Sequence, residues 1–329
     1  MTGSNAKDAA PGIDTIRALR DQLGSAIVRT PVVQCAGIED ALGQDTRVTG
    51  KLEFLQRTGT FKARGALSVV SQLDRAQLDA GITAVSAGNH AIAAAYAART
   101  FGAHAKVVMI GTANPGRIQA CKDFGGEVVM ADSAHAAFEL AESIQRDEGR
   151  FLVHPFEGRD VATGTGTVGL EICEQVDAFD VAIVAIGGGG LIGGVANALK
   201  QLRPGCRVFG VEAEGADSMH RSFAADKPMA IDKVATIADS LGAPYALPYS
   251  FALCRQYVDE LVAVNDQQIR EAMGFLYKHM RIAVEPGCAA STAALLGPLR
   301  KRLAGKKVVI LFCGSNIDWQ TWEAQAIVN

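Results

Sequence analysis

Lys62 has the surroundings that an imine-forming amine requires. It stands in the run Gly-Thr-Phe-Lys-Ala-Arg-Gly-Ala, where the pattern of apolar residues predicts that a helix begins. The positive field of a helix N-terminus and partial burial both lower the pKa of a lysine, which favours the neutral, nucleophilic amine. Taken alone, the same pattern also fits an exposed lysine on a surface helix.

Two further turns could bind anions. The run Ser86-Ala87-Gly88-Asn89-His90 follows a short apolar strand and opens a helix, so its backbone N–H groups could hold a carboxylate. An ordinary helix capped by Asn89 explains this run equally well. The run from Gly187 to Leu191 contains four consecutive glycines between an apolar strand and a helix, which lets several N–H groups surround a phosphate.

The glycine-rich turn also allows a second interpretation. Gly188, Gly190 and Gly193 fit the spacing GxGxxG, and Glu212 ends the next expected strand about twenty residues further on. This spacing is the fingerprint of a dinucleotide-binding site. An NAD-dependent oxidoreductase is therefore a competing class of protein, although it leaves the settings of Lys62 and Asn89 unexplained.

The composition argues against several other classes. The chain has 329 residues, is 49% hydrophobic and carries a net charge of −3, which predicts a large core and no basic surface for nucleic acids or membranes. The seven cysteines show no CxxC spacing and no histidines have metal-binding spacing, so neither disulfides nor zinc are expected.

The polar N-terminus lacks a signal-peptide pattern, which favours the cytoplasm. Glycines interrupt the uncharged stretch 181–199, which favours a strand, a loop and a helix over a membrane span.

Short apolar runs alternate with longer helical patterns along most of the chain. Nearly all-apolar strands that are each followed by a helix predict parallel sheets covered on both faces. Strands are expected at residues 47–52, 83–86, 106–110, 127–130, 151–153, 181–186, 207–212, 261–264 and 307–312. Helices are expected at residues 13–23, 62–73, 89–101, 117–124, 134–146, 167–175, 191–202, 266–281 and 289–303. We expect an α/β protein with a large domain of residues 1–74 and 158–329 and a small, mobile domain of residues 75–157.

In this order, the motifs resemble the serine/threonine dehydratase family, within the fold type II enzymes that use pyridoxal 5'-phosphate (PLP). The resemblance covers nearly the whole chain, from Arg29 to Asn316. It rests on KLE at 51–53, QRTGTFK at 56–62, SAGNH at 86–90, HPF at 154–156, GTGT at 164–167, GGGG at 187–190, EPG at 285–287 and CGSN at 313–316. It implies a fold similar to the β subunit of tryptophan synthase, with two lobes that each contain a mainly parallel sheet flanked by helices.

The resemblance also implies a role for each motif. Lys62 is expected to carry PLP as a Schiff base and to act as the catalytic base. The expected PLP-binding residues are Phe61, Lys62, Asn89, Gly187, Gly188, Gly189, Gly190, Leu191 and Cys313. The expected substrate-binding residues are Ser86, Ala87 and His90. Cys313 would face the pyridine nitrogen, and because a thiol does not hold that nitrogen protonated, loss of a β-leaving group is favoured over transamination.

The implied reaction is dehydration and deamination of a β-hydroxy-α-amino acid to a 2-oxo acid and ammonia. L-Threonine and L-serine are the default substrates, and threo-3-phenylserine and 3-hydroxyaspartate are alternatives. A PLP-shaped binding protein without activity is a further class, but it would be expected to have lost the lysine. A homodimer or homotetramer is expected from the family.

Departures from the family pattern narrow these expectations. Ala87 stands where serine racemases carry a second serine, so racemisation is not expected. Some relatives bind a divalent cation through a glutamate, a backbone carbonyl and an aspartate. Glu212 and Ala216 match the first two, but Ser218 replaces the aspartate, so no metal is expected. Thr165 stands where the family has glutamine, and the chain ends soon after Trp319, so no C-terminal regulatory domain is expected.

Overall fold

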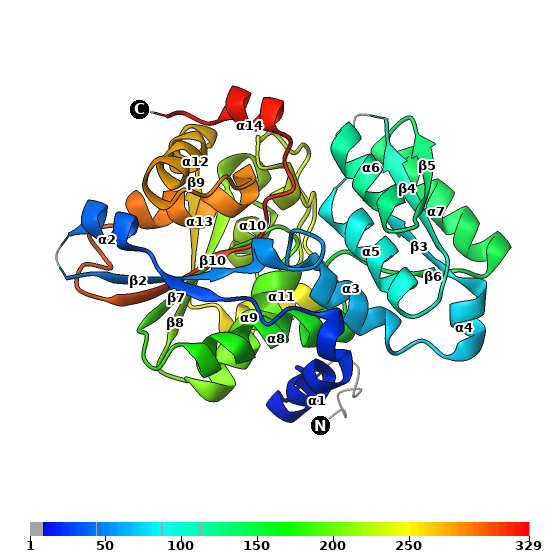
Figure 1. Cartoon of the computed structure of the whole chain (residues 1–329), viewed down its shortest axis with the longest axis horizontal. Helices are drawn as coiled ribbons and strands as arrows, with labels where there is room; N and C mark the ends of the chain where they lie inside the picture. The colour runs from blue at the N-terminus through cyan, green and yellow to red at the C-terminus, as the bar shows by residue number, and fades with distance from the viewer. Residues whose placement is uncertain (1–8, 44, 87, 112, 329) are drawn as a thin grey trace.

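Two helix-covered sheets form two lobes in the computed structural model, which describes residues 9–43, 45–86, 88–111 and 113–328 (Figure 1). The large sheet has the spatial order β1 (Val32–Gln34), β2 (Arg47–Leu52), β10 (Lys307–Phe312), β7 (Val181–Ala185), β8 (Arg207–Ala213) and β9 (Glu260–Val264). The small sheet has the order β5 (Glu127–Ala131), β4 (Ala105–Ile110), β3 (Ile82–Val85) and β6 (Phe151–Leu152). Strands β1 and β2 pair antiparallel, whereas the other pairs that these sheets form are parallel, which confirms the predicted fold class.

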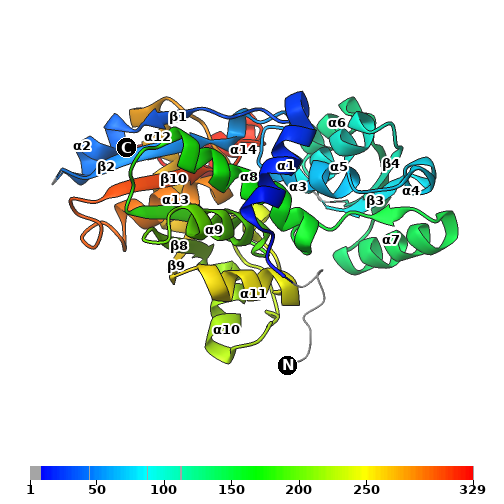
Figure 2. The same ribbon diagram turned by 90° about the horizontal axis from the view of Figure 1, so that it is seen from below.

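Helices cover both faces of each sheet, as parallel sheets require. The helices around the large sheet are α1 (Ile13–Leu23), α2 (Ala36–Leu42), α3 (Lys62–Val70), α8 (Arg159–Gln175), α9 (Gly190–Leu202), α10 (Ser218–Ala225), α11 (Pro248–Tyr257), α12 (Asp266–Met280), α13 (Pro286–Leu296) and α14 (Trp319–Gln325). Those around the small sheet are α4 (Arg75–Ala80), α5 (Asn89–Thr100), α6 (Pro115–Asp123) and α7 (Ala134–Glu148). Figure 2 shows α7 on one side of the small sheet and α5 and α6 on the other.

Four 3₁₀ turns complete the described elements: η1 (Gly24–Ala26), η2 (Glu53–Leu55), η3 (Glu214–Ala216) and η4 (Asp239–Leu241). The uncharged stretch 181–199 folds as the buried strand β7, a glycine-rich turn and most of α9, as its glycines predict. Within the described residues, no helix has both the length and the apolar character that crossing a bilayer requires.

Several predicted boundaries are wrong, and α8 shows why. This helix begins at Arg159, eight residues before the predicted start at residue 167. Gly164 and Gly166 disfavour a helix by propensity, but here they let neighbouring segments of the chain come close. A Cβ at Gly164 would lie 2.3 Å from the carbonyl oxygen of Arg64 in α3. Tertiary packing therefore overrides local propensity.

Other differences are smaller. Helix α3 ends at Val70, and α13 spans Pro286–Leu296, beginning and ending earlier than the predicted 289–303. The elements β1, α2, α4, α10, α11 and α14 were not predicted from the sequence. Most of them are short, and each lacks a long periodic pattern of its own.

Candidate active site

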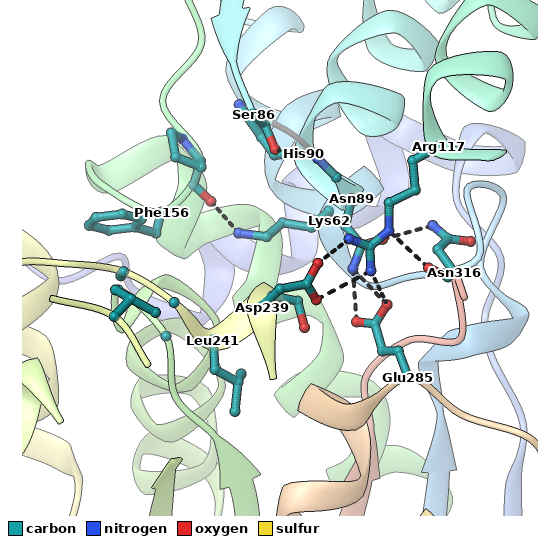
Figure 3. Close-up of a pocket in the computed structure, with 18 of the residues that line it drawn as sticks. Lys62, Ser86, Asn89, His90, Arg117, Phe156, Asp239, Leu241, Glu285 and Asn316 are labelled. Atoms are coloured by element: carbon teal, nitrogen blue, oxygen red, sulfur yellow. Dashed lines mark hydrogen bonds and ion pairs between the residues drawn. The ribbon is translucent and has the colours of Figure 1, made fainter. Parts of the chain in front are cut away.

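A cavity of about 850 Å³ lies where the carboxyl ends of strands from both sheets meet. It is bordered by the turns that follow β3 and β7, the residues after β10 and the start of α3. Side chains from both lobes point into it (Figure 3). The carboxyl edge of parallel strands is the usual place for a ligand in an α/β protein.

The structure brings together nearly all of the residues singled out from the sequence. The cavity is lined by Phe61, Lys62, Ser86, Asn89, His90, Gly187, Gly188, Gly189, Gly190, Leu191 and Cys313. Ala87, expected to bind substrate, lies outside the described residues. Glu212 and Ala216, the two matches to a cation site, do not line this cavity.

Lys62 opens α3, and its amine reaches into the cavity. Its Nζ donates a hydrogen bond to the carbonyl oxygen of Pro155 at 2.6 Å. The preceding residue, Phe61, donates its backbone N–H to the carbonyl oxygen of Cys313 at 3.0 Å, which fixes the start of α3 beside β10. Burial lowers the pKa of Lys62 from 10.5 to about 8. A substantial fraction of the amine is therefore neutral near physiological pH, as imine formation requires.

Two neutral histidines, His90 and His154, lie near this lysine in the cavity. Burial lowers the pKa of His90 to about 3, and His90 Nε2 lies 2.8 Å from the carbonyl oxygen of Val153. Burial also lowers the pKa of His154 to about 4. Its Nδ1 accepts hydrogen bonds from the backbone N–H groups of Phe156 and Glu157, at 3.2 and 2.9 Å. This turn holds Pro155 where its carbonyl can meet the lysine.

The glycine-rich turn packs too closely against Phe156 to admit side chains at Gly188 and Gly190. A Cβ at Gly188 would lie 2.3 Å from the Phe156 ring, and one at Gly190 would lie 2.4 Å from the Phe156 carbonyl oxygen. Gly189 has a φ of +89°, which L-residues with side chains rarely adopt. The turn leads into the N-terminus of α9, so its N–H groups and the helix dipole favour a phosphate here.

Around Asn89, the cavity is lined by polar side chains that were not predicted as site residues from the sequence. Asn89 Nδ2 donates to both carboxylate oxygens of Glu285, at 2.8 and 3.0 Å, and Asn89 Oδ1 accepts from Asn316 Nδ2 at 2.9 Å. Burial raises the pKa of Glu285. Arg117 and Asp239 form an ion pair next to this group (Figure 3). The sequence placed Glu285 and Asn316 in motifs but offered no signal for Arg117 or Asp239.

Cys313 lies directly after β10 and is 4% exposed. The adjacent Cys288 thiol and burial raise its pKa well above the ordinary thiol value. The group therefore stays a neutral thiol, which fits a position beside an unprotonated ring nitrogen better than a carboxylate would.

A low-pKa lysine, a glycine-rich turn for phosphate and a neutral thiol, grouped between two parallel sheets, are the parts of a PLP site. The model for the family "pyridoxal-phosphate dependent enzyme" matches residues 23–314, and the chain belongs to this family.

Named relatives agree with this assignment. A phenylserine dehydratase from Ralstonia pickettii is 49% identical over 95% of both chains. An L-threonine ammonia-lyase from Thermotoga maritima is 35% identical over 93% of this chain and 76% of its own length. The solved structure of maize serine racemase superposes with a TM-score of 0.91 at 34% identity, covering 96% of this chain and 97% of its own.

These comparisons confirm the predicted PLP dependence, the type II fold and an ammonia-lyase that acts on a β-hydroxy amino acid by β-elimination. The dinucleotide alternative is wrong. Glu212, which would bind a ribose, is completely buried, and its carboxylate accepts hydrogen bonds from the backbone N–H groups of Met219 and His220. It also lies 2.5 Å from His220 Nδ1. Among the described residues, no group of three or more His, Cys, Asp or Glu side chains could hold a metal ion.

We expect covalent PLP uptake by the apoprotein to accelerate as pH rises through about 8. PLP condenses only with a neutral amine, and the neutral fraction of Lys62 grows through this range because burial lowers its pKa to about 8. The rate can be followed by the visible absorbance of the imine or by borohydride trapping and mass spectrometry. Free Nα-acetyl-lysine in the same buffers controls for titration of PLP itself. A rise centred near the pKa of an ordinary lysine would contradict a desolvated amine.

Proposed function

We propose that this chain dehydrates and deaminates a β-hydroxy-α-amino acid with an apolar, preferably aromatic, β-substituent, such as threo-3-phenylserine. The products are a 2-oxo acid and ammonia. L-Threonine and L-serine, the default expectation from the sequence, are smaller substrates that the same site admits. The single observation that supports the aromatic substrate is the apolar wall of the cavity.

This wall is formed by side chains of both lobes: Val85, Val108, Ile110, Ala113 and Phe138 from the small lobe, and Val234, Ile237 and Tyr245 from the large lobe. Phe138 is 41% exposed although it is a large aromatic residue. A bound phenyl ring would cover apolar surface that the methyl group of threonine leaves in water. Burial of that surface, with aromatic contacts, favours the larger substituent.

The residues of the site have distinct proposed roles in this reaction. When bound, PLP withdraws electrons from the substrate Cα and so acidifies its proton. Lys62 takes this proton, since its lowered pKa leaves an amine able to act as a base. The start of α5, together with Ser86 and His90, holds the α-carboxylate, which fixes the Cα–H bond relative to Lys62.

The remaining proposed roles concern the cofactor. Gly187 to Gly190 and Leu191 hold its phosphate, Asn89 binds the ring hydroxyl, Cys313 faces the ring nitrogen, and Phe61 packs against the ring. The glycine-rich turn fits this assignment because it lines the cavity and leads into the N-terminus of α9, where N–H groups and the helix dipole favour a phosphate. The buried, neutral Cys313 fits it as well.

The purified holoenzyme should release ammonia from threo-3-phenylserine with kcat/KM at least about tenfold above that for L-threonine, because a well-placed apolar group is worth about 1–3 kcal/mol. Ammonia can be measured for L-threonine, L-serine, threo-3-phenylserine and 3-hydroxyaspartate in parallel. A preference for L-threonine over threo-3-phenylserine would overturn the aromatic assignment and leave the elimination reaction intact.

The variant Phe138→Ala tests whether the apolar wall causes this preference. The variant should lower the ratio of kcat/KM for phenylserine to that for threonine about tenfold, since only the larger substrate reaches this wall. Met130→Ala is the matched control, because Met130 lies on the same lobe, is 47% exposed and does not line the cavity. Equal ratios in the two variants would show that Phe138 does not contact the substrate.

Three broader expectations from the sequence also stay proposals. We propose that residues 75–157 form a domain that moves against residues 1–74 and 158–329, and the separate four-stranded sheet of β3 to β6 supports this division. We also propose that the chain forms a homodimer or homotetramer and acts in the cytoplasm.

A further inference from the structure

Arg117 and Asp239 join the two lobes across the wall of the cavity. Arg117 lies in the first turn of α6 in the small lobe, and Asp239 opens η4 in the large lobe. Arg117 Nη1 donates to Asp239 Oδ2, and Nη2 lies 3.4 Å from Oδ1, so one carboxylate spans the guanidinium fork. The arginine side chain is 11% exposed, whereas that of Asp239 is 57% exposed.

The guanidinium lies beside the turn expected to hold the substrate α-carboxylate. A Cβ built at Gly88 would lie 3.1 Å from Arg117 Nη1, which places the cation directly against this turn. The same side chain donates from Nε to the carbonyl oxygen of Asn316 at 2.9 Å, and Nη2 lies 3.7 Å from Glu285. The charged end of Arg117 is therefore within reach of a small substrate bound at the turn.

We propose that Asp239 determines which β-substituents the site accepts. Its carboxylate pairs with the guanidinium of Arg117, so that a β-carboxylate of the substrate cannot bind this cation. The inference rests on the proposed β-elimination and concerns its substrate range. A substrate with a β-carboxylate, such as threo-3-hydroxyaspartate, would have to displace Asp239 from Arg117.

The charges around Arg117 support this assignment. A planar guanidinium binds carboxylates through two parallel hydrogen bonds, and Asp239 already fills that fork. An incoming carboxylate would also meet the negative charge of Asp239, and like charges brought together in a cavity are unfavourable. An uncharged aryl group meets no such repulsion, so the pair selects against acidic substituents and leaves apolar ones unaffected.

The test compares two substrates within each variant of the holoenzyme. Asp239→Ala should raise the ratio of kcat/KM for threo-3-hydroxyaspartate to that for L-threonine at least about tenfold. Asp239→Asn should raise it less, because the amide oxygen still accepts a hydrogen bond from Arg117. A partly misfolded preparation lowers both rate constants equally, so the ratio reports specificity even if the variant is less stable. An unchanged ratio in Asp239→Ala would overturn the proposal.

A double variant separates recruitment of the arginine from simple loss of negative charge. In Arg117→Met/Asp239→Ala, the ratio should return to about the wild-type value if Arg117 binds the β-carboxylate. A ratio that stays high in the double variant would mean that Arg117 is not the receptor, which contradicts the proposal.

Binding of unreactive acids keeps this test independent of the proposed reaction. Succinate carries two carboxylates and butyrate carries one, and neither has an amino group to react with the cofactor. By calorimetry, Asp239→Ala should bind succinate at least about tenfold more tightly than the wild type while the affinity for butyrate changes little. If the wild type turned over no hydroxy amino acid, the proposed function would fail, whereas equal changes for succinate and butyrate would overturn the role of Asp239.

Discussion

Lys62→Ala is expected to lower kcat/KM for ammonia release by at least about a thousandfold. The substitution removes the amine that carries the cofactor and, in the proposed reaction, the base that takes the Cα proton, and such a base contributes about a hundredfold to ten-thousandfold by itself. The apolar alanine also leaves the carbonyl oxygen of Pro155 without the hydrogen bond from Nζ. Ammonia release from the preferred substrate measures the loss, and the visible spectrum should show PLP without the lysine imine.

Lys122→Ala is the matched control for this variant. Lys122 is an exposed lysine of α6 that does not line the cavity, so its replacement makes the same Lys-to-Ala change without touching the site. Its activity should stay within about twofold of the wild type, since exposed substitutions away from a site have small effects. Added methylamine should partly restore the Lys62→Ala variant, because a small amine can occupy the space of the missing base. More than about a tenth of the wild-type activity in Lys62→Ala would rule out its role as base.

The parts of the site that could be predicted from the sequence are those that depend on local pattern. Lys62 stands at the start of helix α3, and the glycines connect β7 to α9. The local sequence pattern of each segment was enough to predict both positions. The run that forms β10 is almost entirely apolar and bounded by turns, and both β10 and β2 have the predicted limits. These elements bring the lysine and Cys313 together, because adjacent parallel strands end at the same edge of the sheet.

The parts that could not be predicted depend on how distant segments pack. Arg117 and Asp239 are 122 positions apart and come from different lobes, so neither residue has a local pattern that marks it. The early start of α8 depends on the approach of α3, which makes glycine favourable at Gly164. The default expectation of L-threonine also took no account of Phe138, because an aromatic residue in a helix usually faces a core.

Replacing Glu171 by leucine is expected to lower the free energy of unfolding by about 3–5 kcal/mol. Glu171 belongs to a fully buried ion cluster with Arg64, Lys51 and Glu53, whose side chains are all 0% exposed. Arg64 donates to the two oxygens of Glu171 at 2.7 and 2.9 Å, and Lys51 Nζ lies 2.5 Å from it. Loss of Glu171 leaves two buried cations, Arg64 and Lys51, with the single carboxylate of Glu53, and an uncompensated buried charge costs far more than the pair itself contributes. Urea unfolding of the holoenzyme measures the effect.

Glu174→Leu, one turn further along α8, separates this effect from the general loss of a carboxylate. Glu174 is 34% exposed and pairs at the surface with Arg20 at 2.6 Å and Arg29 at 3.3 Å, so its loss should cost less than about 1 kcal/mol. Equal losses in the two variants would refute the buried cluster as a source of stability.

Because Arg64 follows Lys62 by two residues in α3, the cluster also fixes the helix that presents the lysine. Glu171→Leu should therefore weaken retention of PLP, measured by dialysis, whereas Glu174→Leu should retain the cofactor.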